Sequence, residues 1–247
     1  MDEEEVPLLV VTHVDDIIAA GSVGDCDALC EALSTEFPTN NLGPLSWYTG
    51  CAFERDWEKG TLTSTQTAYI DQLQYPDRRM ISLVQSASKN SFGALLWVVC
   101  MSRPDISNPG RALTRYHQDP SKTHWHQGIK TQRYLLGTRT WGINYRRGLG
   151  QELFACADSS YAGDTNDRRS VSGGAIMFGG GAVSWFSRTQ KTVAQSSSEA
   201  EYVAMGECVK EPLLYAMCCI SCNPCTVCPV CMCWKTTREQ STWLRTL

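Results

Sequence analysis

Two sets of carboxylates stand far apart in this chain, in patterns that could support metal chemistry. Asp15 and Asp16 are adjacent and lie between short apolar runs, in LLVVTHVDDIIAAG. Asp158 occurs in CADSSYAGD, and Glu201 follows it in SSSEAEYVA. Carboxylate oxygens are hard ligands that suit magnesium, and pairs of them at strand ends and turns can hold cations for phosphoryl transfer. These residues therefore predict chemistry on a polynucleotide.

The elements around Asp15 and Asp16 are short strands and one helix. The apolar runs at 6–11 and 17–20 predict a tight hairpin with the two carboxylates at its tip. Leu29, Leu33 and Phe37 share one face of a helix expected over 25–37. Strands are expected over 46–55 and 61–64, around a turn at Lys59 and Gly60.

The middle of the chain predicts helices, and the segment after Leu153 predicts strands. The stretch 74–90 is weakly patterned and is the best linker candidate, followed by helices over 92–101 and 123–136. Strands are expected in FACADSSYAG, SGGAIMFGG, AVSWFSRT and KTVAQ. A helix should then begin at the serine triplet, with Ser196 and Glu199 as a capping box and an apolar stripe of Ala200, Val203, Ala204 and Cys208.

Bulk composition permits a core but gives little electrostatic signal. The chain has 247 residues, 43% of them hydrophobic, and a formal net charge of -4. The stretch 111–147, however, contains only one acid, Asp119, and eight basic residues. The basic residues are Arg111, Arg115, Lys122, Lys130, Arg133, Arg139, Arg146 and Arg147. This stretch fits contact with a phosphate backbone and equally fits a solvated basic helix face.

The sequence shows neither a signal-peptide pattern at its amino terminus nor a long apolar run. The amino terminus is acidic, MDEEE, where a signal peptide would be basic and then apolar, and no run of eighteen apolar residues exists. The sequence therefore predicts an intracellular protein, cytoplasmic or nuclear, with no membrane segment. Its oligomeric state is left open.

Five segments, in order, resemble the pol polyprotein of copia-type retrotransposons, in which reverse transcriptase runs directly into ribonuclease H. They are HVDDIIAAG, FPTNNLGPLSWYTGCAFERD, SFGALLWVVCMSRPDIS, THWHQGIKTQRYLLGTRTWGINY and CADSSYAGDTNDRRSVSGGAIMFGGGAVSWFSRTQKTVAQSSSEAEYVAM. The first is similar to the polymerase YVDD hairpin and the last to the ribonuclease H segment. The resemblance covers about 6–210.

For the polymerase, the resemblance implies that Asp15 and Asp16 are catalytic carboxylates and magnesium ligands. The family places a third carboxylate on an earlier strand, whereas this chain begins fourteen residues before Asp15. His13 also stands where relatives usually have tyrosine. Because two-metal transfer needs both sides of the metal clamp, we expect no polymerase site in this chain alone.

For ribonuclease H, the resemblance implies that Asp158 and Glu201 are catalytic and bind magnesium. Asp164 and Asp167 are expected in a turn, and Glu199 at the helix start. The family's third carboxylate, usually in a D-N-Q setting, is missing after Glu201. Magnesium is therefore not expected to bind productively.

Other departures from the family pattern concern helices. Pro212 is expected to interrupt the helix after Glu201, at a cost of about 3 kcal/mol if the position is interior. The segment Asn108-Pro109-Gly110 replaces a helix-compatible one after the RPDIS motif.

Seven of the thirteen cysteines crowd between Cys218 and Cys233. Their repeated C-x-x-C spacing fits a zinc thiolate cluster, and an oxidation-prone tract is an alternative. We favour a third hypothesis, a shifted reading frame. Back-translated with permitted codons and shifted by two bases, Cys233–Leu247 becomes LEDNQGAIHLAENP, which contains the missing D-N-Q.

Together these patterns predict an α+β protein: a partial reverse-transcriptase palm (1–73), a linker with connection helices (74–150), an incomplete ribonuclease H-like α/β domain (151–217) and an out-of-frame cysteine-rich tail (218–247). The expected identity is an inactive remnant of a copia-type enzyme whose family partner is an RNA–DNA hybrid. Two alternatives stay open. One is a non-catalytic nucleic-acid-binding module using Arg111, Arg115, Lys122, Lys130 and Arg133, and the other is a metal-binding protein using the cysteine tail.

Overall fold

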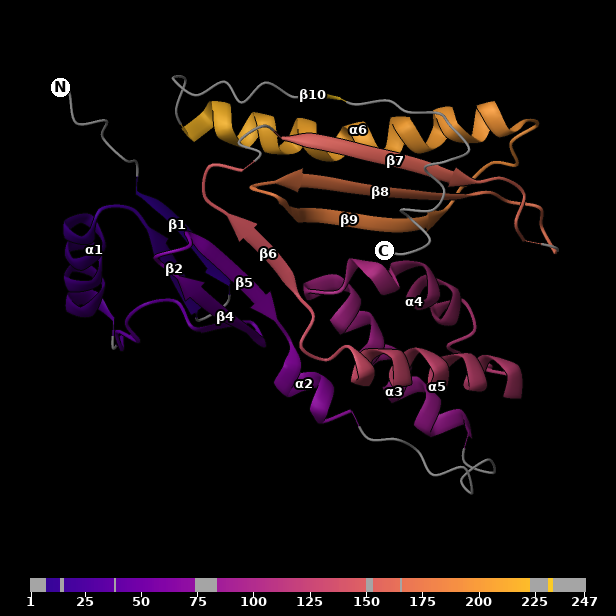
Figure 1. Cartoon of the computed structure of the whole chain (residues 1–247), viewed down its shortest axis with the longest axis horizontal. Helices are drawn as coiled ribbons and strands as arrows, with labels where there is room; N and C mark the ends of the chain where they lie inside the picture. Colours follow the sequence, from indigo (N-terminus) through magenta and orange to yellow (C-terminus); the bar gives the residue numbers. More distant parts are fainter. Residues whose placement is uncertain are drawn as a thin grey trace. The chain divides into compact units, whose positions relative to one another are not determined.

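The computed structural model describes residues 8–13, 16–37, 39–73, 84–149, 153–164, 166–222 and 231–232 (Figure 1). The described part mixes helices with antiparallel strands, as the sequence predicted at the level of fold class. The chain divides into two compact units, Met1–Phe53 and Glu54–Leu247, which are considered separately.

The first unit contains the hairpin expected from the apolar runs. Strands β1 (Leu9–His13) and β2 (Asp16–Ala20) pair antiparallel, with Leu9 opposite Ala20 and His13 opposite Asp16. Helix α1 (Val23–Glu36) follows, and the Ser22 side chain caps it by accepting a hydrogen bond from the amide of Asp25 at 3.1 Å. The predicted hairpin strands and helix are therefore confirmed.

A second hairpin uses positive φ angles at its turn. Strand β3 (Trp47–Tyr48) pairs antiparallel with the start of β4 (Cys51–Asp56). The two residues between them, Thr49 and Gly50, have φ values of 47° and 82°. Two consecutive positive φ angles match the twist of flanking strands, which explains why a glycine occupies the second position.

The second unit contains a helical cluster with its own core. Its members are α2 (Thr67–Asp71), α3 (Val84–Met101), a 3₁₀ turn (Pro104–Ile106), α4 (Ser107–Thr114) and α5 (Lys122–Gly137). Apolar residues from all of these segments pack together: Ile70, Phe92, Leu95, Val98, Val99, Ile106, Leu113 and Leu135. The helices are thus held by burial of their apolar faces.

Two expectations for this cluster are wrong. Residues 84–90, expected in a linker, belong to α3, since Gln, Ala, Ser and Lys tolerate a helix without an apolar stripe. Pro109 and Gly110 lie within α4. Proline is tolerated in a first helical turn, and a Cβ on Gly110 would come within 2.8 Å of Val99 Cγ2, so the glycine allows α3 and α4 to approach.

Strands far apart in sequence meet beside the helices. Strand β5 (Thr61–Thr65) pairs antiparallel with β6 (Ile143–Arg146), with Thr61 opposite Arg146. Gly142, just before β6, lies against β5, and a Cβ there would be 2.0 Å from the Ser64 carbonyl oxygen. This pairing therefore requires glycine at 142.

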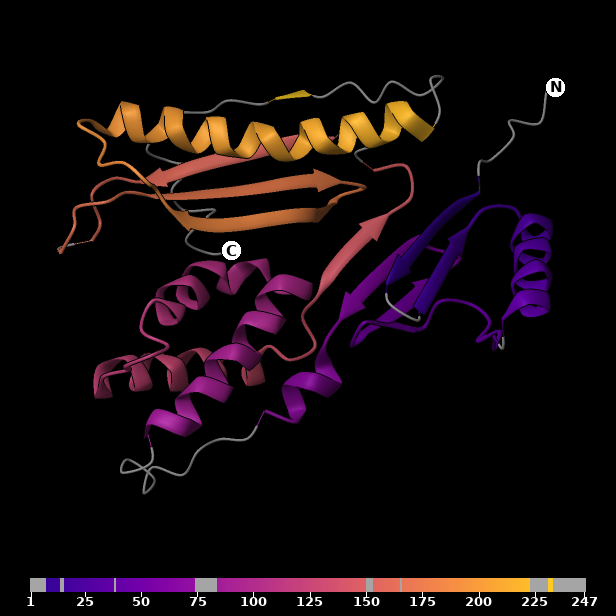
Figure 2. The same cartoon turned by 180° about the vertical axis from the view of Figure 1, so that it is seen from behind.

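The last part of the second unit is a four-stranded sheet with the order β10-β7-β8-β9. Its strands are β7 (Phe154–Ser160), β8 (Val171–Phe178), β9 (Gly181–Thr189) and the short β10 (Cys231–Met232), which pairs parallel with β7. Helix α6 (Ser197–Cys222) packs against β7 and β8, and Figure 2 shows it lying along the strands. Leu153, Ile176, Phe186 and Cys208 form the core beneath it.

Two sequence expectations fail near α6. The segment 191–195, expected as a strand, contains bends and no strand. Helix α6 continues past Pro212 without ending there. A proline has a helical φ angle and removes one amide donor, and this loss alone does not stop the helix.

Candidate functional site

Asp158 lies on β7, opposite Gly173 of β8. Its neighbour Ser159 stands opposite Ser172, which is fully buried. The strand expected in FACADSSYAG is therefore formed. Its register with β8 fixes the position of Asp158 along the sheet.

Glu201 is positioned by the capped start of α6. The Ser196 hydroxyl accepts a hydrogen bond from the amide of Glu199 at 3.1 Å, as predicted for a helix cap. The Glu199 carboxylate accepts from the amide of Gln195 at 2.7 Å, so its expected role at the helix start is confirmed. These bonds fix the first turn, and Glu201 follows on the second.

Gln190, which the sequence analysis did not single out, ties the helix to the sheet. Its fully buried amide donates hydrogen bonds to the Ala200 carbonyl at 2.8 Å and to Ser172 Oγ at 3.0 Å. Ala200 precedes Glu201, and Ser172 lies beside Gly173, the strand partner of Asp158. Gln190 therefore ties the start of α6 to β8, the strand that pairs with β7 at Asp158. Its only sequence signal was its place within the quoted ribonuclease H pattern.

The pKa values of both carboxylates are raised, and the charge of Asp158 contributes to the rise at Glu201. Burial raises the pKa of Asp158 above its ordinary value. Burial also raises the pKa of Glu201, and repulsion from the Asp158 charge adds to that rise. Asp158 and Glu201 are thus two half-buried acids from different elements whose ionised forms are disfavoured. A cation between them would relieve that cost.

The donor set fits magnesium. Magnesium usually keeps several waters and takes one or two protein carboxylates together with substrate phosphates. Asp158 and Glu201 supply two hard oxygen ligands at the surface of the sheet. Among the described residues no group of three or more His, Cys, Asp or Glu side chains comes together.

We expect Asp158→Asn to stabilise the cation-free protein near pH 8. Because the folded-state pKa of Asp158 is raised, folded chains bind more protons than unfolded ones, and stability falls as pH rises through the ordinary value of about 4 to the folded value. The amide mimics the neutral acid, so the gain in melting temperature should vanish below about pH 4.

A control of opposite sign is Asp164→Asn. Hydrogen bonding by the Asn166 amide and by Arg115 lowers the pKa of Asp164, so its charge stabilises the fold above its ordinary pKa and that contribution is lost as pH falls. Melting curves across this pH range compare both variants. A lower melting temperature for Asp158→Asn at pH 8 would contradict the assignment of a penalised charge.

The first carboxylate pair is described only in part. Asp15 lies outside the described residues. Asp16 begins β2 opposite His13, whose ring meets Tyr48 edge-on with centroids 6.5 Å apart. Asp16 is exposed, and among the described residues it belongs to no group of three or more His, Cys, Asp or Glu side chains that could hold a metal ion.

Two of the predicted nucleic-acid-binding residues have protein partners instead. Arg111 donates to Thr189 Oγ1 and to Asn108 Oδ1, both at 2.9 Å. Arg115 pairs with Asp164 and lies 3.6 Å from Asp167. The two aspartates sit in the turn between β7 and β8, as expected, where they accept bonds from the amides of Asn166 and Arg169.

The other three predicted basic residues are exposed on α5. Lys130 and Arg133 follow Lys122 by eight and eleven residues, so the helical period places the three along one face. None of them forms an ion pair with any residue that the structure describes. This exposed basic face is available to a polyanion.

Comparison with known proteins gives transposon Pol polyproteins and also proteins that carry other names. The Pol polyprotein from transposon TNT 1-94 of Nicotiana tabacum is 28% identical over 232 residues, covering 83% of this chain and 17% of the relative. An uncharacterized mitochondrial protein of Arabidopsis thaliana, AtMg00810, is 26% identical over 226 residues, covering 80% of this chain and 90% of the relative. Secreted RxLR effector protein 161 of Plasmopara viticola is 38% identical over 122 residues, covering 49% of this chain and 86% of the relative.

The chain is homologous to copia-type retrotransposon Pol polyproteins over most of its length. Relatives from transposons RE1, RE2 and Ty5 support this. The copia-type chain spans a small part of the full-length polyproteins it matches. No family model and no solved structure matches it.

In this copia-type chain, no helix among the described residues is long and apolar enough to cross a membrane. The predicted cysteine cluster lies outside the residues whose side chains are described.

Proposed function

We propose that this chain is a remnant of the reverse transcriptase and ribonuclease H region, in which Asp158 and Glu201 still bind a divalent cation. The proposed division is a partial palm (1–73), connection helices (74–150), an incomplete ribonuclease H-like domain (151–217) and a cysteine-rich tail (218–247). The observation that carries the proposal is the packing of α6, which carries Glu201, against β7, which carries Asp158, and the Asp158 charge contributes to the raised pKa of Glu201.

The surrounding fold supports this proposal. An antiparallel run of three strands is followed by a helix packed on two of them, with a parallel strand added beside β7. The resemblance places the two carboxylates on a central strand and the adjoining helix. Magnesium held there would stabilise negative charge on a phosphate oxygen. Asp158 and Glu201 would orient that ion, and Gln190 would hold the start of α6 against β8.

Cation binding tests the proposal. At a magnesium or manganese concentration of ten times the dissociation constant, we expect stabilisation by about 1.4 kcal/mol, measured from unfolding curves. Asp158→Asn and Glu201→Gln should each abolish this gain because each removes a charged ligand.

Glu199→Gln is the matched control, since Glu199 lies two residues away and bonds to the Gln195 amide. It should keep the full cation-dependent gain. An undiminished gain in both ligand variants would reject the Asp158 and Glu201 site.

A second candidate function is nucleic-acid binding without catalysis. It is favoured by the exposed face of α5 that carries Lys122, Lys130 and Arg133, because these charges have no described protein partner. Duplex binding that weakens with salt would support this function. The metal-binding alternative through the cysteine tail rests on residues 218–233 and draws no support from the described structure.

A further inference from the structure

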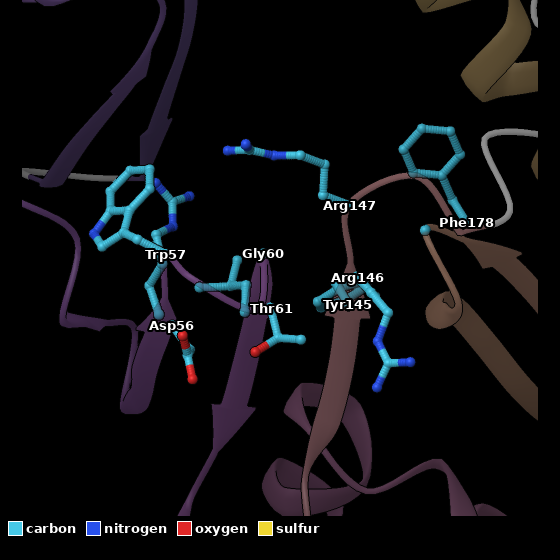
Figure 3. A pocket seen from close by; sticks show the side chains of 11 residues that line it. Asp56, Trp57, Gly60, Thr61, Tyr145, Arg146, Arg147 and Phe178 are labelled. Carbon is cyan, nitrogen blue, oxygen red and sulfur yellow. The ribbon is translucent and has the colours of Figure 1, made fainter.

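A basic and aromatic pocket lies away from the carboxylate pair, within the unit Glu54–Leu247. Three segments line it: the end of β4 with the turn into β5, the end of β6, and the turn from β8 to β9 (Figure 3). Its volume is about 360 Å³, within the range of small-ligand sites. Sequence analysis could not find it, since its parts are more than thirty residues apart.

Backbone hydrogen bonds hold the three segments together. The amide of Arg147 donates to the Gly60 carbonyl and that of Arg146 to the Gly179 carbonyl, each at 2.8 Å. Gly60 and Gly179 have φ values of 62° and 59°, a region that favours glycine. The Tyr145 hydroxyl donates to the Ala182 carbonyl at 2.8 Å. The pocket is thus built by paired strands.

The charge of the pocket is positive. Arg55, Arg146 and Arg147 line it, and none forms an ion pair with a described residue. The one acid of the lining, Asp56, is bound to Lys59 at 2.8 Å, and that hydrogen bond lowers its pKa. The arginines therefore remain available to an anion.

Exposed aromatic rings accompany these arginines. Trp57 is 66% exposed, Phe178 is 43% exposed, and the Arg55 guanidinium lies 4.5 Å from the centre of the Trp57 ring. Figure 3 shows the Arg147 side chain extending toward the Trp57 side of the pocket, while Arg146 points the other way. A ring for stacking and a guanidinium for a phosphate thus face the same space.

We propose that this pocket binds single-stranded nucleic acid, with an unpaired base stacked on Trp57 and its phosphate held by Arg147 and Arg55. Aromatic side chains stack on bases that are not already paired, and arginines track the backbone of a single strand. A duplex would use the charges alone, so the exposed Trp57 favours a single strand. This site shares no residue with the Asp158 and Glu201 pair or with the basic face of α5.

The test is fluorescence anisotropy of a labelled twelve-nucleotide oligo-dT at several salt concentrations. Trp57→Ala should weaken binding about tenfold with an unchanged salt slope, because stacking is lost. Arg147→Ala should weaken binding and reduce the salt slope by about 0.7, because one phosphate contact is lost. Trp57→Phe, which keeps a ring, should restore most of the affinity.

Matched controls separate the pocket from general surface effects. Phe37 is exposed to 61%, similar to Trp57, and Lys191 is an exposed cation outside the pocket. Phe37→Ala and Lys191→Ala should leave oligo-dT affinity within about twofold. Equal losses in these controls, unchanged binding by Trp57→Ala, or equal competition by a duplex of the same length would each overturn the proposal. Cation-dependent stabilisation should be unaffected in every pocket variant, which distinguishes this result from that of the carboxylate site.

Discussion

Asp105→Asn will destabilise the second unit by about 3–5 kcal/mol, measured by urea unfolding. Arg103 is only 1% exposed, and its Nε and Nη2 donate to the two oxygens of Asp105 at 2.9 and 2.7 Å. Removing the carboxylate charge leaves a buried guanidinium without a counter-charge. Since domains have a total stability of roughly 5–15 kcal/mol, this loss is large.

The network around Arg103 explains why the cost should be high. Its Nη1 donates to the Thr138 carbonyl at 3.0 Å, and its Nη2 also donates to Thr138 Oγ1 at 2.7 Å. The Tyr134 hydroxyl donates to Asp105 at 2.8 Å. Burial alone would raise the pKa of Asp105, but hydrogen bonds and charge from Arg103 outweigh it and leave that pKa lowered. The stabilisation is therefore present above its ordinary pKa and is lost as pH falls.

An exposed ion pair nearby supplies the control. Arg139 and Asp71 approach to 3.2 Å, with side chains 55% and 44% exposed. Asp71→Asn removes the same charge but should cost no more than about 1 kcal/mol, because solvent screens the pair. Equal losses of unfolding free energy for Asp71→Asn and Asp105→Asn would contradict the prediction. They would show that burial of the Arg103 and Asp105 pair adds no stability beyond that of an exposed pair.

Periodicity and capping signals predicted much of the local structure. The strands β7, β8 and β9 and the start of α6 at Ser196 follow directly from alternating apolar residues and a serine cap. The apolar stripe of α6 was also visible, since Ala200, Ala204 and Cys208 are buried. These features depend on residues that are close together in the sequence, so the sequence pattern alone indicates them.

Features that depend on distant partners were not predictable. Charge alone cannot distinguish Arg115, which is paired with Asp164, from Arg133, which is exposed on α5. The close approach of Gly110 in α4 to Val99 in α3 joins two helices, and no local pattern shows it. The pocket around Arg147 exists only because β6 returns to β5 after eighty residues.

The strongest functional expectation concerns the reading frame of the tail. We expect the present chain not to cleave the RNA strand of an RNA–DNA hybrid, because the carboxylate pair lacks the third acid that the family supplies from a later strand. A continuation of strand β10 could be that later strand. Strand β10 pairs parallel with β7, with Cys231 opposite Phe154 and Met232 opposite Ala155.

The register of β10 on β7 makes the frameshift hypothesis testable in three dimensions. If the shifted frame LEDNQGAI follows Met232 directly, its leucine, glutamate and aspartate take positions 233, 234 and 235. Continuing the pairing of β10 and β7 by three further residues brings position 235 opposite Asp158. The restored aspartate would then stand beside the carboxylate pair on the neighbouring strand, close enough to join it around a cation.

We therefore expect a chain in which Cys233–Leu247 is replaced by the shifted-frame sequence, extended as the coding DNA allows, to cleave the RNA strand of a hybrid in the presence of magnesium. The unchanged chain, assayed in parallel with a labelled hybrid, should release no product above background. Asp158→Asn in the restored chain should abolish cleavage because a metal ligand is lost, whereas Glu199→Gln should retain it because Glu199 serves the helix start. Cleavage by the unchanged chain would remove the need for a third acid. A folded, magnesium-binding restored chain without cleavage would reject the frameshift as the cause of inactivity.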